Sequence, residues 1–148
     1  MRDNSASRVP PPPGFHWTLV LILGIATLGI FGYVWAIVQA HWAKKYDPSS
    51  RALKLYIIAM AVSLVGVVLE SLNVNAPLEA VLEIAGALIA TFGAFSVKDT
   101  LAEYMTDIER RPAYLSGMMT IILGEVYLQY HMNRVRSFQS HAALSGAH

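Results

Sequence analysis

Four apolar segments, separated by polar or charged stretches, divide the chain. They cover residues 15–42, about 52–72, about 77–97 and 113–130. A helix of about 20 residues crosses the roughly 30 Å hydrocarbon core of a bilayer. The second and third segments have this length, and only the short turn at residues 71–76 separates them. The pattern therefore predicts two membrane-spanning helices that form a central hairpin.

The first and fourth segments carry interruptions. Residues 27–32 read TLGIFG, in which a threonine and two glycines three positions apart weaken a helix. The fourth segment has 13 uncharged residues between Arg111 and Glu125, so a full crossing would bury the Glu125 carboxylate. We therefore predict that both segments are broken or re-entrant helices that flank the hairpin. The alternative is four spanning helices. Either arrangement gives an all-α membrane protein.

Other local signals set the expected boundaries. Asp47-Pro48 and Asn75 with Pro77 predict capped helix starts for the second and third segments. After Lys98, apolar residues at helical spacing over residues 101–108 predict a separate helix on the membrane surface. We expect a disordered proline-rich tail at 1–14, a single helical membrane domain at 15–136 and a flexible tail at 137–148.

The distribution of charge favours the re-entrant arrangement. Residues 69–84 contain no Lys or Arg, and re-entrant outer segments place all 11 basic residues on the opposite face. Four crossings would instead divide them seven against four. Because basic residues near spanning segments are retained in the cytoplasm, we predict that both termini are cytoplasmic.

Composition narrows the function classes. The chain is 55% apolar and 14% charged, with a mean hydropathy of +0.44, which is too apolar for an ordinary soluble domain. It has no cysteine, which excludes disulfides and thiolate chemistry, and its scattered basic residues disfavour nucleic-acid binding. No catalytic set or metal motif is identifiable, so we expect neither enzyme activity nor a cofactor.

Glu125 is the main candidate for chemistry, because an ionisable group in an apolar segment is costly to bury. Glu125, Tyr127 and His41 are the candidate residues for an ion or proton site, and Gln129 at i+4 is able to bond Glu125. The alternative places Glu125 near the lipid headgroups, where water solvates it.

Two further sets of charged residues are candidates. An outer cation site uses carboxylates at the turn, with Asn73 or Asn75 as further ligands: Glu70, Glu79 and Glu83. The alternative is that these carboxylates lie on a translocated loop and bind no ion. A basic connector is expected to contact anionic lipid headgroups: Lys44, Lys45, Arg51 and Lys54.

The first and fourth segments also echo one another. Thr27, Gly32-Tyr33-Val34-Trp35, Gln39 and His41 correspond to Thr120, Gly124-Glu125-Val126-Tyr127, Gln129 and His131, with spacings that differ by one or two residues. Residues 26–35, ATLGIFGYVW, resemble the T-x-G-I-[FY]-x-x-x-W signature of small bacterial membrane proteins catalogued as domains of unknown function. The resemblance covers some 40 N-terminal residues. It implies a bacterial inner-membrane protein and no particular reaction.

These observations predict a non-catalytic interaction or scaffold subunit with a basic cytoplasmic face. Its expected partners are anionic membrane lipids and either further copies of itself or a larger membrane complex. The alternative is a small oligomeric channel or transporter that uses Glu125 in a polar path.

Overall fold

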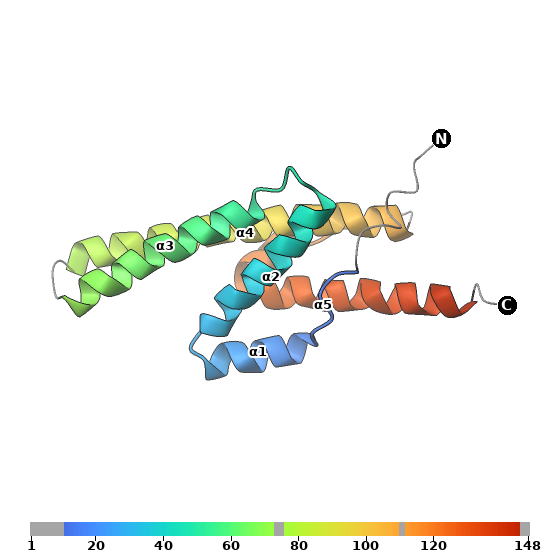
Figure 1. Ribbon diagram of the computed structural model, residues 1–148, viewed down its shortest axis with the longest axis horizontal. Coiled ribbons are helices and arrows are strands. Elements are labelled where there is room, and N and C mark those ends of the chain that lie inside the picture. The colour runs from blue at the N-terminus through green and yellow to red at the C-terminus, as the bar shows by residue number, and fades with distance from the viewer. Residues whose placement is uncertain (1–10, 73–75, 110–111, 146–148) are drawn as a thin grey trace.

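The computed structural model describes residues 11–72, 76–109 and 112–145. These residues form five helices and no strand: α1 (Trp17–Ala26), α2 (Ile30–Tyr46), α3 (Ala52–Ser71), α4 (Ala76–Glu109) and α5 (Gly117–Ser145). The prediction of an all-helical protein is confirmed. The hairpin of α3 and α4 extends furthest toward one end of the molecule, and the α1–α2 hairpin reaches part of the way in the same direction (Figure 1). The last turns of α4 and α5 point toward the opposite end (Figure 1).

The first apolar segment is broken into two helices at the Thr-Gly stretch, as the sequence predicts. Thr27 serves both helices, since its hydroxyl donates to the Leu23 carbonyl over 2.7 Å and accepts from the Phe31 amide over 2.9 Å. Leu28 and Gly29 then take left-handed backbone angles, with φ of 51° and 92°. The direction of the chain reverses between α1 and α2 as a result (Figure 1).

The fourth segment breaks at a single glycine. Gly124 has φ 46° and ψ −123° inside α5, which is not a helical conformation. This combination is adopted readily by glycine alone, because other residues place a Cβ against the backbone there. The residues on the two sides of Gly124 therefore form two helical pieces that meet at a kink.

Small residues bring α3 and α4 close together. A Cβ added at Gly86 would lie 2.7 Å from the Ser63 hydroxyl oxygen and 3.5 Å from the Ala59 carbonyl. One at Gly93 would lie 3.2 Å from the ring of Tyr56. The hairpin therefore depends on glycine at its contact face.

Several predicted boundaries are wrong. α4 continues without a break to Glu109, so the stretch after Lys98 is not a separate surface helix. α5 begins at Gly117 and remains helical to Ser145, where a tail was expected from residue 137. Asp47 does not cap α3, which begins at Ala52. Its carboxylate instead accepts from the Ser49 amide and hydroxyl. Asn75, residues 1–10 of the expected N-terminal tail and residues 146–148 lie outside the described residues.

Exposed and buried apolar side chains occupy different parts of the molecule. Among the described residues, every exposed large aliphatic or methionine side chain lies within 19–38, 57–88 or 118–123. The main core cluster lies instead within 36–56 and 94–135, and includes Trp42, Tyr56, Leu101 and Met132. The apolar face at residues 101–105, which was predicted to lie on the membrane surface, is instead buried in this core as part of α4. One half of the molecule therefore has a packed interior, and the other half has an apolar exterior.

In the part of the chain that the structure describes, two helices are long and apolar enough to cross a membrane, Ala52–Ser71 and Pro77–Ile108. Only 22% of the most apolar stretch of each is buried inside the protein. This low burial distinguishes them from the core helices of a soluble protein, whose apolar faces are covered.

Candidate functional site

A buried polar centre joins the two broken segments. Gln39 of α2 and Gln129 of α5 have no exposed surface, and the Gln39 side-chain amide donates to the Gln129 side-chain oxygen over 3.2 Å. The Trp35 indole donates to the same oxygen over 2.9 Å. The echoing residues of the first and fourth segments therefore face one another, and their amides form the contact.

Gln129 also fixes the polypeptide that precedes α1. Its side-chain nitrogen lies 2.8 Å from the Pro13 carbonyl, 2.7 Å from the Phe15 carbonyl and 2.9 Å from the Asn133 side-chain oxygen. These contacts satisfy polar groups that would otherwise be costly to bury. The Gln129 amide makes these contacts in place of the predicted hydrogen bond to the Glu125 carboxylate.

Glu125 lies beside this centre and contacts α3. The Tyr56 hydroxyl of α3 donates to a Glu125 carboxylate oxygen over 3.3 Å. The Gln39 side-chain amide donates to the Glu125 backbone carbonyl over 3.0 Å. The Gln39 side-chain oxygen is buried and has no hydrogen-bond partner among the described residues. Glu125, Tyr56 and Gln39 are thus the polar residues that α5, α3 and α2 bring together at the kink.

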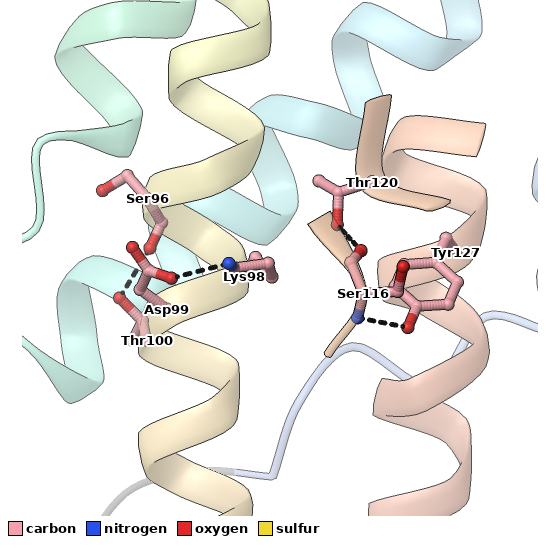
Figure 2. Close-up of polar contacts among 7 residues, drawn as sticks. All are labelled: Ser96, Lys98, Asp99, Thr100, Ser116, Thr120 and Tyr127. Atoms are coloured by element: carbon pink, nitrogen blue, oxygen red, sulfur yellow. Dashed lines mark hydrogen bonds and ion pairs between the residues drawn. The ribbon is translucent and has the colours of Figure 1, made fainter. Parts of the chain in front are cut away.

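The structure does not bring Tyr127 and His41 to Glu125 as predicted. The Tyr127 hydroxyl accepts from the Ser116 amide over 3.0 Å, on the side facing the start of α5 (Figure 2). The Thr120 hydroxyl bonds the Ser116 carbonyl at 2.9 Å, so both contacts hold the residues that lead into α5 (Figure 2). His41 is exposed on α2. Tyr127 is therefore a positioning residue that ties the first piece of α5 to the second.

The outer carboxylates do not form a metal site. Within the residues that the structure describes, no group of three or more His, Cys, Asp or Glu side chains is placed to hold a metal ion. Glu70 lies on α3, whereas Glu79 and Glu83 lie on α4, and the expected ligands Asn73 and Asn75 fall outside the described residues. Among the described residues, the three carboxylates therefore do not come together as the predicted outer cation site.

The basic connector is fully accessible. Its four cations are exposed and occupy the last turn of α2, the loop and the first turn of α3: Lys44, Lys45, Arg51 and Lys54. Close by, the Tyr46 hydroxyl donates to the Asp107 carboxylate over 2.5 Å and joins α2 to α4. Burial, followed by this hydrogen bond, raises the pKa of Tyr46 above its ordinary value of 10.0.

A cleft of about 450 Å³ opens between the connector and α4. Its charged lining consists of Arg51 and three carboxylates, those of Asp47, Asp99 and Glu103. Its apolar lining consists of Leu55, Phe92 and Phe95. The sequence offers no motif for this cleft, because its walls come from segments some 50 residues apart.

Sequence reasoning identified Glu125 and missed most of its surroundings. Gln39 and Gln129 occupy corresponding positions in the first and fourth segments, and this correspondence was the signal in the sequence for their contact. Tyr56 carried no such signal, because its approach to Glu125 depends on how α3 and α5 pack. No protein-family model, curated protein or solved structure matches the chain. The resemblance of residues 26–35 to small bacterial membrane proteins therefore stays a prediction.

Proposed function

We propose that the chain is a non-catalytic interaction or scaffold subunit of a bacterial inner membrane. In this proposal α3 and α4 span the bilayer, whereas α1–α2 and the first piece of α5 enter from the cytoplasmic side and return. The packed half, with both termini, lies in the cytoplasm. Its basic connector binds anionic lipid, and its surface is available to further copies or to a larger membrane complex.

The apolar tips of the two broken segments are the observation that carries the proposal. At the α1–α2 turn, Leu28 is 96% exposed and both Ile25 and Ile30 are 70% exposed. At the α5 kink, Ile121 and Ile122 are 61% and 66% exposed. A turn in water carries polar residues, and an irregular backbone inside a bilayer needs protein to satisfy its polar groups. Thr27 bonds both helix ends at the first turn.

The connector supports the proposed orientation. Its four cations are exposed beside the first turn of α3, where a spanning helix would leave the bilayer. Each Lys or Arg near an anionic leaflet contributes about 1 kcal/mol of binding free energy. Because such cations are retained in the cytoplasm, they support an orientation with the α3–α4 turn outside.

Single-cysteine labelling tests the topology without background, because the natural chain has no cysteine. In intact cells, a membrane-impermeant maleimide should label Leu72→Cys at the end of α3 and should leave Ser49→Cys in the connector unlabelled. Ser5→Cys and Ser145→Cys should also stay unlabelled until the membrane is permeabilised. Labelling of both end positions from outside would support four spanning helices and contradict the re-entrant arrangement.

A charge series tests the lipid role. Replacing the connector cations by glutamine, as Lys44→Gln, Lys45→Gln, Arg51→Gln and Lys54→Gln together, should reduce co-purification of anionic lipid. The matched control replaces the three lysines by arginine, which keeps the charge and should keep the lipid. Equal lipid recovery from both variants would contradict the proposed contact.

A small oligomeric channel or transporter is the second candidate, favoured by the contact between Glu125 and Tyr56 beside a helix break. Discontinuous membrane helices commonly form ion sites where their backbone is interrupted. In proteoliposomes, Glu125→Gln should abolish proton or cation flux and Tyr56→Phe should reduce it. Glu70→Gln, which changes an exposed carboxylate, should leave it unchanged. A wild-type protein that conducts nothing would remove this candidate.

A further inference from the structure

The cleft beside the connector lies at the level where the surface changes from apolar to charged. Along α4, the exposed apolar side chains end at Leu88 and Phe92, and after Glu83 the next charged residues are Lys98 and Asp99. Along α3, exposed apolar side chains begin at Ile57, two residues beyond the cleft residue Leu55. If α3 and α4 span the bilayer as proposed, the cleft opens at the boundary between hydrocarbon and headgroups.

The two walls of the cleft differ in charge: the α4 wall carries only carboxylates, whereas the connector wall carries the guanidinium of Arg51 as well as the carboxylate of Asp47. Arg51 stands on the connector wall, at the residue that immediately precedes α3. Asp99 and Glu103 stand one turn apart on the α4 wall, and Asp47 adds a third carboxylate from the loop. Figure 2 shows Ser96, Asp99 and Thr100 gathered on one side of α4, and the Ser96 hydroxyl lies 3.3 Å from that of Ser50 across the cleft.

The connector wall suits a phosphate group. α3 is 20 residues long and begins without a side-chain hydrogen-bond cap at Arg51. The first backbone amides of a helix have no partner inside the helix, and they carry partial positive charge. Together with an adjacent guanidinium, such amides bind phosphate oxygens.

The α4 wall suits a primary ammonium group. Its carboxylates accept the N–H donors that an ammonium presents, and a quaternary ammonium has no such donor. One Asp99 oxygen already pairs with Lys98 over 3.1 Å, which leaves a second oxygen on that carboxylate and both on Glu103 for a ligand. Phe92 and Phe95 extend the apolar part of the cleft toward the proposed bilayer.

We propose that this cleft binds one phospholipid with a phosphoethanolamine headgroup. Arg51 and the start of α3 hold its phosphate, Asp99 and Glu103 hold its ammonium, and Leu55, Phe92 and Phe95 contact the first part of its acyl chains. The proposal rests on the membrane insertion proposed above. It differs from the attraction of the connector to anionic lipid, because it requires a zwitterion.

The test uses the full chain reconstituted in nanodiscs with equal amounts of phosphoethanolamine, phosphocholine and phosphoglycerol lipids, followed by native mass spectrometry of the lipid retained. We expect about a tenfold enrichment of the phosphoethanolamine lipid over the phosphocholine lipid, the effect of one hydrogen bond to a charged group. Asp99→Asn with Glu103→Gln should abolish this preference. Arg51→Gln should lower retention of both zwitterionic lipids.

Arg134→Gln is the matched control for Arg51→Gln, because it removes an exposed cation on α5 that neither lines the cleft nor belongs to the basic connector. It should leave the preference unchanged, and circular dichroism should show the same helicity for all variants. Equal retention of the three lipids, or a preference that survives the Asp99 and Glu103 changes, would overturn the proposal. Failure of the wild-type chain to insert into the nanodisc would instead contradict the proposed membrane function.

Discussion

Gln129 holds together three parts of the chain that are distant in sequence. Its side chain bonds Trp35 and Gln39 of α2 and the carbonyl of Phe15 before α1. Gln129→Leu would leave the Trp35 indole N–H without this partner, remove one of the two bonds of the Gln39 amide and release the Phe15 carbonyl, and each buried group left unpaired costs about 1–3 kcal/mol. We expect the free energy of unfolding in mixed micelles to fall by about 2–4 kcal/mol. His41→Leu, a similar change at an exposed position on α2, should alter it by less than about 0.5 kcal/mol.

Tyr46 is expected to make the free energy of unfolding depend on pH in the alkaline range. Because burial and the Asp107 contact raise its pKa in the folded state, ionisation of the hydroxyl opposes folding. The contribution of Tyr46 is complete below pH of about 10 and declines as pH rises above it. Tyr46→Phe should therefore lose about 1 kcal/mol at neutral pH and show a smaller further loss at alkaline pH. Tyr33→Phe, at an exposed position, is the control for the other tyrosines. An unchanged alkaline loss in Tyr46→Phe would contradict this role.

At the residue scale, the sequence identified single groups better than their partners. Glu125 stood out because a carboxylate in an apolar segment has a large desolvation cost, which is a local property. Its contact with Tyr56 depends on the register of α3 against α5, and no residue near either position encodes that register. Tyr127 was misassigned for the same reason, since its hydroxyl bonds Ser116.

The two helix breaks differ in how well their residues suit them. A residue other than glycine costs about 1–2 kcal/mol in the left-handed region, where Leu28 has φ 51°. Leu28→Gly should therefore raise the free energy of unfolding by about 1 kcal/mol. Gly124→Ala should lower it by about 1–3 kcal/mol. No atom lies within 4 Å of a Cβ placed at Gly124, so that loss would measure backbone strain alone. A neutral Gly124→Ala variant would show that the kink is not fixed by its glycine.

The packing of α3 against α4 provides a second test at the scale of helices. Gly86→Leu would drive a side chain into Ser63 and the Ala59 carbonyl and should destabilise the protein by about 1–3 kcal/mol. The matched control is Gly24→Leu in α1, because nothing lies within 4 Å of a Cβ there. Thermal unfolding in detergent compares the two. Equal unfolding temperatures would contradict close packing at Gly86.

Elements were predicted well where the signal is local and poorly where it is not. The breaks follow from Thr27, Gly29 and Gly124, whose conformational preferences act within a few residues. The length of α4 could not be predicted in the same way. The apolar face at residues 101–105 suits a helix on a membrane surface as well as one packed in a core, and it is buried here. To choose between a surface helix and a core helix, one must know whether α2 and α5 pack against this face of α4.

At the scale of the whole molecule, the re-entrant and four-span arrangements differ in how far apart the ends of the first segment lie. Leu19 and His41 are 22 positions apart, so one continuous helix would separate them by about 33 Å. In the α1–α2 hairpin the chain reverses between them (Figure 1). Paired spin labels at Leu19→Cys and His41→Cys in nanodiscs should therefore report a distance well below about 33 Å. The control pair, Lys54→Cys and Ser71→Cys, lies 17 positions apart on the unbroken α3 and should report about 26 Å. A distance near 33 Å for the first pair, with the control as expected, would mean that the first segment crosses the bilayer. The apolar turn at Leu28 would then be an ordinary part of a spanning helix, and the cytoplasmic placement of the N-terminus would fail with it.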